Sequence, residues 1–517
     1  MTALLVALAC IAVAIVAARL VFALPQADRT GLSRAIPVSQ QTALGRVAAD
    51  HGEASAILSL DGGREAFAAR ALLIRAAERS IDVQYYIWQN DITGMLLLRE
   101  LRDAADRGVR VRLLLDDNGI AGLDRELAGL LGHDDVELRL WNPFVLRRPK
   151  ILNYAFDFFR LNRRMHNKSL TVDGAVTIVG GRNVGDEYFA ARSTGDFFDL
   201  DVMAVGAIVP KVAAQFDAYW TSGSVHDGEA ILGAGDRAHL DAAIAASERE
   251  PRSTQYRDAI AAMQFVADFV DGDLELETVD ISLVADDPRK GAGGVEGRAL
   301  LVGQLDALLG RPTRDVDLVS AYFVPGTRGT QALADMAGRG VEVSILTNSL
   351  AATDVAAVHA GYAKYRRALL AAGTRLFELK REQTRPVKQA NPGDDLERDD
   401  FGPGGSSAAS LHAKTFGIDG ERVFIGSFNM DPRSVYLNTE MGFLIESEPL
   451  ARALSDRLET ALRFSAYRVE LTDDGHLVWI ETLADGSTVT HSDEPDASWA
   501  RRATVAVVRR LPVEWLL

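Results

Sequence analysis

Two stretches of the chain repeat one polar pattern. Residues 165–173 read MHNKSLTVD and residues 180–183 read GGRN, while residues 411–419 read LHAKTFGID and residues 426–429 read GSFN. Both stretches follow His-x-Lys, four residues, Asp, six residues and Gly-small-x-Asn, with identical spacing. A single match of this kind is weak evidence, but two matched copies are very hard to obtain by chance. The pattern therefore predicts a duplicated chain with one polar set in each half.

Each polar set follows a matching stretch of alternating apolar and amphipathic sequence. Residues 80–117 and 315–349 both read as an apolar strand, a loop, an amphipathic helix ending at Arg-Gly, and a second apolar strand. Strand–helix–strand with a glycine helix stop predicts parallel pairing. The expected fold is therefore α/β, with two duplicated domains related by a pseudo-twofold axis.

The expected domain boundaries follow from this duplication and from composition. A 517-residue chain is too long for one ordinary core. We predict an N-terminal membrane or signal segment at residues 1–24, a linker at residues 25–50, a first domain at residues 51–250 and a second at residues 251–517. A stretch rich in Pro, Gly, Asp and Ser, residues 380–410, is predicted as a long loop, either a lid or a disordered segment.

The N-terminal segment carries no charge from Thr2 to Ala18, and its apolar run resumes after Arg19. That length predicts a transmembrane anchor, with a cleaved signal peptide as the alternative because no basic residue precedes Arg19. Arg19, Arg29 and Arg34 follow the apolar core, so the positive-inside rule places the body in the cytoplasm.

Composition excludes some classes of protein. The formal net charge is −16 and the pI about 5.1, which disfavours sequence-independent binding of nucleic acid. Cys10 is the only cysteine, so neither an intramolecular disulfide nor a cysteine-based zinc site can form.

The spacing of the motifs indicates a phosphate site. Residues i and i+2 of a strand point to one face, so His166 projects with Lys168, and His412 with Lys414. Ammonium, amide and backbone N–H groups that converge on one point suit a tetrahedral phosphate. One neutral imidazole can attack phosphorus, and a second, protonated imidazole can donate a proton to the leaving oxygen.

The tails of the motifs supply the remaining candidate ligands. Gly181 and Ser427 are small, so backbone N–H groups can approach a ligand closely there. Asn183 and Asn429 add amide donors. We therefore predict that these four residues bind substrate.

These residues resemble the paired HKD motifs of the phospholipase D superfamily, over nearly the whole chain after the N-terminal segment. The layout most resembles bacterial cardiolipin synthases of the C type. Supporting stretches are GRNVGDEYF at residues 181–189, NTE at residues 438–440 and LPVEWLL at residues 511–517.

The resemblance implies an α/β fold of two duplicated phospholipase D-like α/β/α domains with mixed sheets, packed about a pseudo-twofold axis, and a role for each motif residue. His166 would be the nucleophile and His412 the general acid and base. The phosphate oxygens would be held by four side chains: Lys168, Lys414, Asn183 and Asn429. No metal and no cofactor would be required.

The family also places an acidic residue about thirty positions after each histidine, where it orients that imidazole. By position these are Asp199 and Glu440, with Asp201 as a rival for the first. Asp173 and Asp419 complete the two motifs and count among the catalytic candidates, although tying down a turn is the favoured role for both.

The substrate is less directly encoded. Residues 144–168 carry seven basic residues and one acid, with aromatic residues between them. This composition suits an anionic membrane surface, single-stranded nucleic acid, or a plain helix with a solvated basic edge. The predicted anchor and the overall acidity favour lipid.

The resulting hypothesis is a phosphatidyl transferase of the bacterial inner membrane that makes cardiolipin through a phosphohistidine. The expected partners are phosphatidylglycerol, phosphatidylethanolamine, the membrane surface and an accessory protein, whereas nucleic acid is disfavoured. The alternatives are a hydrolase that releases phosphatidic acid and a nuclease of the same fold.

Overall fold

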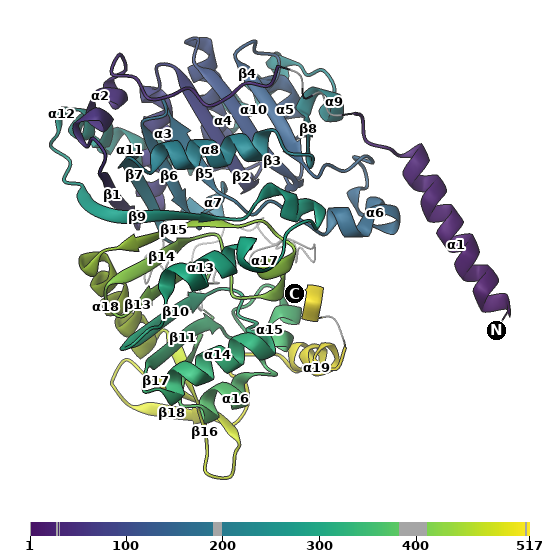
Figure 1. Ribbon diagram of the computed structural model, residues 1–517, viewed down its shortest axis with the longest axis vertical. Helices are drawn as coiled ribbons and strands as arrows, with labels where there is room; N and C mark the ends of the chain where they lie inside the picture. The colour runs from purple at the N-terminus through teal and green to yellow at the C-terminus, as the bar shows by residue number, and fades with distance from the viewer. Residues whose placement is uncertain are drawn as a thin grey trace.

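The computed structural model describes residues 2–26, 29, 31–189, 199–381, 411–511 and 514–516. Over these residues the body consists of two α/β halves, the first in the upper part of Figure 1 and the second below it. Most of the loop predicted at residues 380–410 lies outside the described residues, so that expectation stays a prediction.

The first half contains a mixed sheet with the strand order β8–β4–β3–β2–β5–β6–β7–β1. Its central strands β2, β3 and β4 pair in parallel and the others antiparallel; the parallel pairing of β2 with β3 confirms the strand–helix–strand prediction. The strands are β1 (Ser55–Leu60), β2 (Ser80–Ile87), β3 (Arg110–Gly119), β4 (Val136–Trp141), β5 (Ser169–Val172), β6 (Val176–Gly180), β7 (Asp201–Gly206) and β8 (Val225–Asp227).

The second half repeats this order as β16–β12–β11–β10–β13–β14–β15–β9, and a hairpin of β17 and β18 extends it. Strand β9 also pairs with β1, so it joins the two sheets. The strands are β9 (Glu277–Ala285), β10 (Asp315–Ser320), β11 (Glu342–Asn348), β12 (Arg375–Leu379), β13 (Lys414–Ile418), β14 (Arg422–Gly426), β15 (Met441–Glu446), β16 (Ala466–Leu471), β17 (Leu477–Thr482) and β18 (Thr488–His491). The duplication predicted from two motifs therefore extends to the topology.

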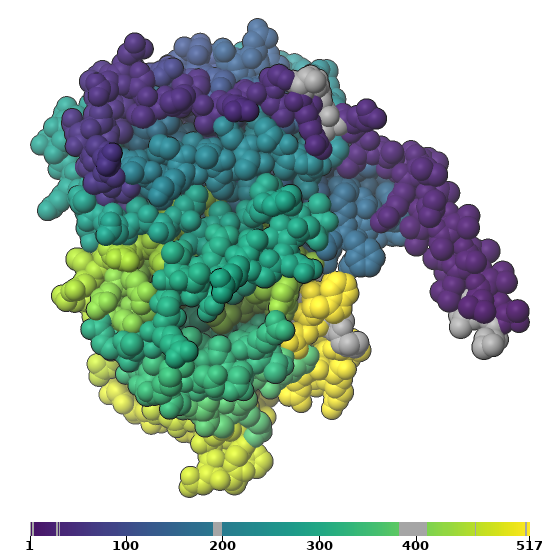
Figure 2. All heavy atoms as spheres, in the orientation of Figure 1, coloured from purple at the N-terminus to yellow at the C-terminus, as the bar shows by residue number. Residues whose placement is uncertain are grey.

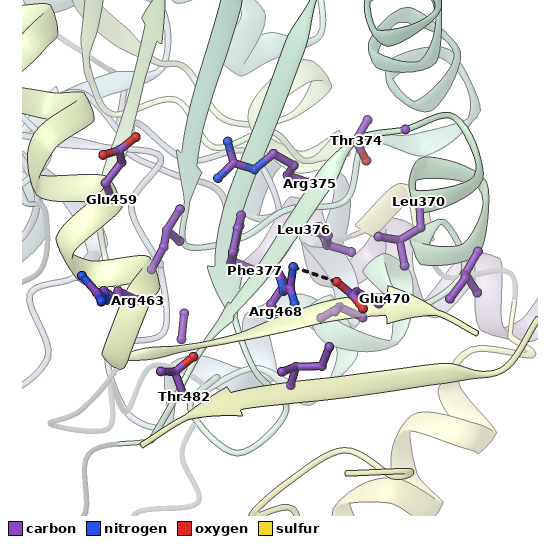
Figure 3. Close-up of a pocket in the computed structure, with 16 residues that line it drawn as sticks. Leu370, Thr374, Arg375, Leu376, Phe377, Glu459, Arg463, Arg468, Glu470 and Thr482 are labelled. Carbon is purple, nitrogen blue, oxygen red and sulfur yellow. Dashed lines mark ion pairs between the residues drawn. The ribbon is translucent and has the colours of Figure 1, made fainter. Parts of the chain in front are cut away.

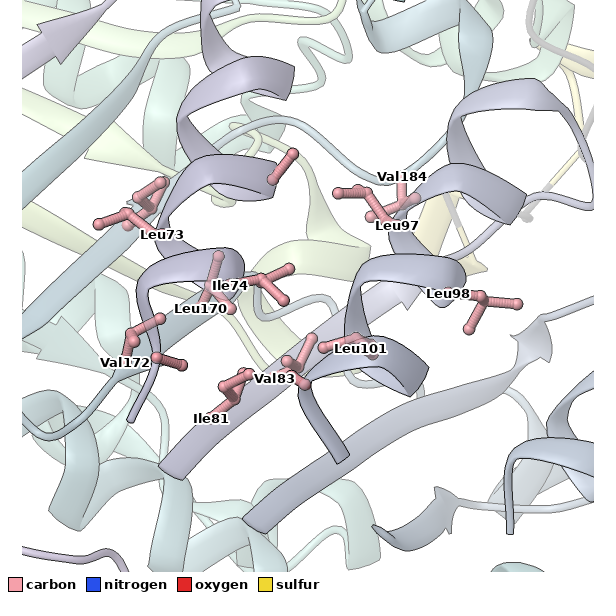
Figure 4. Packing of buried hydrophobic residues seen from close by; sticks show 14 of the residues in the cluster. Leu73, Ile74, Ile81, Val83, Leu97, Leu98, Leu101, Leu170, Val172 and Val184 are labelled. Atoms are coloured by element: carbon pink, nitrogen blue, oxygen red, sulfur yellow. The ribbon is translucent and has the colours of Figure 1, made fainter. Parts of the chain in front are cut away.

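Helices α3 and α4 cover one face of the first sheet (Figure 4). Leu73 of α3 and Leu101 of α4 belong to the same buried cluster as Val83 of β2 and Leu170 of β5. Each such side chain contributes roughly 1.5–3 kcal/mol by leaving water. The helices associated with this half are α2 (Ala43–Asp50), α3 (Gly63–Ala76), α4 (Ile92–Asp106), α5 (Asp124–Leu130), η1 (Lys150–Asn153), α6 (Tyr154–Leu161), α7 (Asp186–Phe189), α8 (Val209–Trp220) and α9 (Gly228–Leu232).

The region around the predicted domain boundary is helical, with α10 (Arg237–Arg249), α11 (Ser253–Ala262) and α12 (Phe265–Asp271). Helix α10 contacts α4 and α5, while α11 and α12 contact α3. All three therefore pack on the first half, and the boundary at residue 250 stays a prediction.

The two halves share a buried core. Val179 and Val202, from β6 and β7, cluster with Ile425 and Phe443, from β14 and β15. The helices that follow β9 are η2 (Pro288–Ala292), η3 (Gly297–Ala299), α13 (Leu301–Leu309), α14 (Gly326–Gly338), α15 (Ala356–Tyr362), α16 (Arg366–Ala371), α17 (Pro432–Tyr436), α18 (Glu448–Phe464), α19 (Trp499–Val508) and η4 (Glu514–Leu516).

Helix α1 (Thr2–Val21) extends away from the body in Figure 1. The C-terminal end of α1 contacts α6, where Arg19 pairs with Asp157 at 3.5 Å and Phe22, directly after the helix, stacks on Phe156. Among the helices of the described ranges, none combines the length and apolar character needed to span a bilayer. The membrane helix predicted at residues 1–24 is therefore not confirmed.

Candidate active site between the two halves

Both histidines lie on the extended segments that lead into a hairpin strand. His166 precedes β5 and His412 precedes β13, so the equivalent strands of the duplicated sheets present them. The backbone N–H of His166 donates to the carbonyl of Thr439 at 2.8 Å, a contact that crosses from the first half to the second. The first motif is therefore held directly at the boundary between the halves.

Each histidine is bound by the carboxylate of the opposite half. His166 Nδ1 lies 2.8 Å from Glu440 Oε2, and His412 Nδ1 lies 2.9 Å from Asp199 Oδ2. The expectation that each acid orients the histidine of its own motif is therefore wrong. Because the halves face each other, the acid that follows one motif reaches the imidazole of the other.

Asp201, the rival candidate for the first acid, has a different role. Its carboxylate binds Arg70 at 2.8 Å and lies 3.3 Å from Arg182, with all three side chains almost fully buried. It therefore belongs to a structural ion-pair network beneath β7.

The two lysines lie beside their own histidines. Lys168 Nζ donates to the carbonyl of His166 at 2.5 Å, and Lys414 Nζ donates to the carbonyl of His412 and lies 3.2 Å from its Nδ1. Burial, together with the charge of Lys414, lowers the pKa of Lys168 well below its ordinary value. Two buried cations at one point form a site that an anion would stabilise.

The pKa values of the two imidazoles are lowered to different extents. Burial, Lys168 and Lys414 hold the pKa of His166 well below its ordinary value, so this ring is neutral at pH 7. Burial also lowers the pKa of His412, but Asp199 opposes that effect.

The pKa values of the two carboxylates are shifted in opposite directions. Burial raises the pKa of Glu440 to about 7, although Lys168 lowers it. Burial would also raise the pKa of Asp199, but His412 and Lys414 outweigh it and hold that pKa well below its ordinary value. Asp199 is therefore ionised throughout the neutral range, whereas Glu440 titrates within it.

Gly181 and Ser427 lie at the site but serve the carboxylates. A Cβ atom on Gly181 would come within 2.9 Å of Asp199 Oδ1, so glycine leaves room for that acid. The carbonyl of Ser427 lies 3.0 Å from His166 Nδ1, and its hydroxyl donates to Glu440. Substrate binding by these two residues stays a prediction.

The two asparagines are buried with an unsatisfied amide atom. Asn183 accepts a hydrogen bond from the backbone N–H of Ile87 at 3.3 Å. Asn183 Nδ2 and Asn429 Oδ1 make no hydrogen bond to any residue in the described part of the chain. Buried polar groups usually have partners, so the free donor on Asn183 suits an oxygen of a bound phosphate.

Asp173 and Asp419 are not brought to the histidines. Both occupy hairpin turns with positive φ, at the opposite ends of β5 and β13 from the imidazoles. Asp173 accepts backbone N–H bonds from residues 78–80, and Asp419 accepts them from residues 313–315. Their placement among the catalytic candidates is therefore corrected: each carboxylate fastens its hairpin turn to the start of the neighbouring central strand.

Sequence reasoning assigned no site role to two tyrosines. The ring of Tyr86 meets His166 edge-on at 5.0 Å between centroids, and Tyr188 meets His412 likewise at 4.9 Å. Tyr86 is the residue before the last of β2, and Tyr188 lies within the stretch at residues 181–189 that carried the resemblance, so both positions held a usable signal.

A buried ion pair behind Glu440 was also missed. Asp286 Oδ2 accepts from the backbone N–H of Glu440 at 2.9 Å and from Lys290 Nζ at 2.7 Å. Lys290 also donates to the carbonyl of Ser434 at 2.8 Å. These residues follow β9 and have no equivalent in the repeated motif, so the repeat could not reveal them.

A cavity of about 760 Å³ has neither histidine among its lining residues, most of which are labelled in Figure 3. It is bounded by the end of α18 and by β12, β16 and β17, with Arg375, Arg463 and Arg468 among its lining residues. Its described lining includes neither motif, so we do not assign the reaction to it.

Comparison with known proteins agrees with this geometry. The family model described as "Cardiolipin synthase, PLD-like domain" matches residues 72–220 and 305–462. The chain is 46% identical over 465 residues to cardiolipin synthase C of Escherichia coli strain K12, covering 89% of this chain and 96% of that protein. It is 26% identical over 424 residues to a cardiolipin synthase of Staphylococcus aureus strain Mu50, covering 81% of this chain and 69% of that protein.

The fold has a solved relative as well. The crystal structure of phosphatidylserine synthase from Haemophilus influenzae Rd KW20 superposes with a TM-score of 0.54 at 14% identity, covering 92% of this chain and all of that one. At that identity the likeness concerns the fold alone. The motifs, the family match and the 46% identity together show that this chain is a member of the cardiolipin synthase family of the phospholipase D superfamily, of the cardiolipin synthase C type.

Proposed function

We propose that the protein transfers a phosphatidyl group from one phospholipid to the hydroxyl of another and thereby makes cardiolipin. The observation that carries this proposal is the reciprocal arrangement in which His166 binds Glu440 and His412 binds Asp199. It presents two oriented imidazoles from opposite halves, which a two-step displacement at phosphorus requires.

In the first step, His166 attacks the phosphorus of the donor lipid through Nε2, because its Nδ1 is engaged by Glu440. A P–N bond forms and the P–O bond to the headgroup breaks. His412 donates its Nε2 proton to the departing alkoxide, which leaves as an alcohol. The low pKa of His166 keeps the attacking nitrogen unprotonated.

In the second step, the hydroxyl of the acceptor lipid attacks the phosphohistidine. His412, now neutral, removes the hydroxyl proton; a new P–O bond forms, and the P–N bond to His166 breaks. With phosphatidylglycerol as the acceptor, the product is cardiolipin. Lys168, Lys414 and Asn183 bind the phosphate oxygens. Burial lowers the pKa of both lysines, and the charge of a bound phosphate favours their ammonium form.

Hydrolysis is the second candidate, since water in place of the acceptor would give phosphatidic acid from the same intermediate. Burial of the site favours transfer, because His166 is 7% exposed and water has little access to it. The nuclease alternative is disfavoured by the net charge of −16.

We further propose that the enzyme works at the bacterial inner membrane with its body in the cytoplasm. Between Leu5 and Val16 the side chains of α1 are apolar and largely exposed, and basic residues follow at Arg19, Arg29 and Arg34. The donor is either phosphatidylglycerol or phosphatidylethanolamine, and an accessory protein would act by supplying or positioning one of these lipids.

The test is lipid product analysis with the full chain in mixed vesicles of phosphatidylglycerol and phosphatidylethanolamine. His166→Ala is the active-site variant, and His476→Ala is its matched control because His476 is largely exposed and lies outside both motifs. Cardiolipin is expected from the wild type and the control but not from His166→Ala.

The other outcomes discriminate among the alternatives. Phosphatidic acid alone would identify a hydrolase and contradict the transfer proposal. Untouched lipids together with cleavage of single-stranded nucleic acid would contradict the lipid substrate while leaving the two-histidine chemistry intact. Headgroup analysis names the donor, since released glycerol or ethanolamine marks phosphatidylglycerol or phosphatidylethanolamine respectively.

A further inference from the structure

One side of the molecule exposes large apolar side chains on the segments that flank the catalytic residues. Ile151 and Leu152 of η1 are 62% and 53% exposed, and Phe159 of α6 is 64% exposed. Tyr436 of α17 is 56% exposed, and Trp515 of η4 is 51% exposed. We call these five residues the apolar face.

Hydrogen bonds hold the segments of the apolar face together. Arg433 of α17 donates to Asn162 at the end of α6 and also to the carbonyl of Leu516 in η4. Figure 1 places α6 and η4 on the same side of the body as α1, and Figure 2 shows the surfaces of α6 and the C-terminal segment adjoining there. The segments that carry the five side chains are therefore joined to one another, and α1 emerges beside α6.

Some basic residues of these segments pair with acids, and others do not. Most basic residues of the segment at residues 144–168 are committed to acids of the first half, for example Arg147 to Asp124 and Arg164 to Asp116. Arg148 and Arg509 are exposed, and no carboxylate in the described part of the chain pairs with either. In a chain of net charge −16, exposed cations close in sequence to the apolar face, Arg148 three residues before Ile151 and Arg509 six residues before Trp515, are complementary to anionic headgroups.

The apolar face is also adjacent to the reaction centre along the chain. Helix α6 ends at Leu161, five residues before His166, and Arg164 binds Thr439 through its carbonyl. Helix α17 lies between Asn429 and Glu440. The same short segments therefore connect the exposed apolar side chains to both histidine-bearing constellations.

We propose that the apolar face docks on the surface of an anionic phospholipid bilayer and inserts Ile151, Leu152, Phe159, Tyr436 and Trp515 among the headgroups. Exposed apolar clusters with a polar rim mark membrane or protein contacts, and rings at headgroup depth beside arginines suit a lipid interface. The proposal rests on the proposed function, because it assigns the surface through which that site meets its lipid substrates.

The test uses the full chain with Cys10→Ser, which removes the only cysteine. A single cysteine is then placed at Phe159 or Trp515 and labelled with an environment-sensitive fluorophore. Ala484, exposed in the turn between β17 and β18 at the far end of the body, is the matched control. The vesicles contain phosphatidylglycerol and phosphatidylethanolamine, and they carry a lipid-attached quencher in a parallel series.

On binding to these vesicles, the labels at Phe159 and Trp515 are expected to shift to shorter wavelength and be quenched, while the label at Ala484 stays unchanged. Phe159→Glu combined with Trp515→Glu is expected to weaken vesicle binding about tenfold or more. If the protein binds vesicles through α1 while both labels remain in water, the docking proposal is wrong.

Cardiolipin formation is assayed on the same samples, so the docking proposal and the proposed function are tested independently. Cardiolipin made while both labels remain in water contradicts only the docking face. Quenched labels without any phosphatidyl transfer contradict only the proposed function. Labels that insert into neutral phosphatidylcholine vesicles as well as into anionic ones would overturn the assignment of an anionic surface.

Discussion

His166 and His412 occupy equivalent positions in two halves of the same topology, yet their surroundings differ. The side chain of His166 is 9% exposed and its acid, Glu440, is fully buried; the side chain of His412 is 24% exposed and its acid, Asp199, is 12% exposed. Burial raises the pKa of Glu440 to about 7, whereas the cations around Asp199 hold its pKa below the ordinary value. The duplication supplies two imidazoles, and the surroundings give them different tasks.

The difference agrees with the proposed division of labour. A buried neutral imidazole is a good nucleophile, and an imidazole beside a permanently ionised acid holds a proton more readily. The family resemblance assigns the same roles from position alone. Substitutions that change the surroundings of one histidine but not of the other can therefore test whether the surroundings decide these roles.

The largest effect is expected from the histidines themselves. His166→Ala removes the nucleophile and should abolish cardiolipin formation, whereas His412→Ala removes the acid and should lower the rate by about 10²–10⁴-fold. Because His412 also activates the acceptor, the His412→Ala variant should retain phosphatidyl label on protein after an acid-free quench. Mass spectrometry of the labelled protein locates the adduct.

The comparison would fail if label accumulated on His412 in the His166→Ala variant. It would also fail if both single variants lost activity equally and neither ever carried label. His476→Ala serves as the control for expression and folding.

The second effect concerns the crossed carboxylates. Asp199→Asn removes the charge that raises the pKa of His412, so less of that ring is protonated at a given pH. We expect about a 100-fold lower kcat and an alkaline limb of the pH–rate profile displaced to lower pH. Profiles of kcat and of kcat/KM between pH 5 and pH 9 measure the two quantities.

Glu440→Gln should act on the opposite limb. Glu440 must be ionised to accept the Nδ1 proton of His166, and its pKa is about 7, so wild-type activity should fall as the pH drops through that value. A glutamine does not titrate, so the variant should be slower, again by about 100-fold, and should lack this acidic limb. Identical shifts in the two variants would contradict the asymmetry.

The crossing of these acids shows what the sequence could and could not provide. The repeated strand–helix–strand pattern and the spacing of the two motifs predicted the duplication, both histidines and both lysines, because strand periodicity acts within a few residues. The family resemblance located Asp199 and Glu440 by position. Which acid meets which histidine depends on how the halves pack, and no local pattern encodes that contact.

The same reason explains the other differences. Asp173 and Asp419 belong to the repeated pattern because the hairpin turn is repeated. A match to the motif alone does not show whether a residue stabilises a turn or takes part in the reaction. Lys290 and Asp286 were missed because they occur only in the second half. Tyr86 was visible as a strand-end aromatic residue, but its contact with His166 is tertiary.

A third, smaller effect on activity is expected at Lys290, a residue without a counterpart in the first half. Lys290→Met removes a buried cation that lowers the pKa of Glu440, so that pKa should rise and the acidic limb should move to higher pH. Breaking a buried pair with Asp286 should also destabilise the fold by about 3–5 kcal/mol. We expect about a tenfold loss of kcat at pH 7.

Arg366→Met is the matched control for this variant, because Arg366 is equally buried and pairs with Glu378 and Glu494. It should destabilise the fold comparably, as chemical denaturation can measure, without moving the acidic limb. A limb that moves in both variants would mean that Lys290 acts only through general stability.

The smallest effect on catalysis is expected at the two turn aspartates, where the halves should behave alike. Asp173→Asn and Asp419→Asn keep a residue that tolerates positive φ but lose the charge that accepts three backbone N–H groups in each half. Each should therefore lower the free energy of unfolding by about 2 kcal/mol. The kcat of the folded fraction should remain within about threefold of wild type, because neither carboxylate contacts an imidazole. A loss of kcat near that of Asp199→Asn, at unchanged stability, would mean that these aspartates act in the reaction after all. An equal loss of stability in both variants would show that the two halves differ around the imidazoles and not in the sheets that carry them.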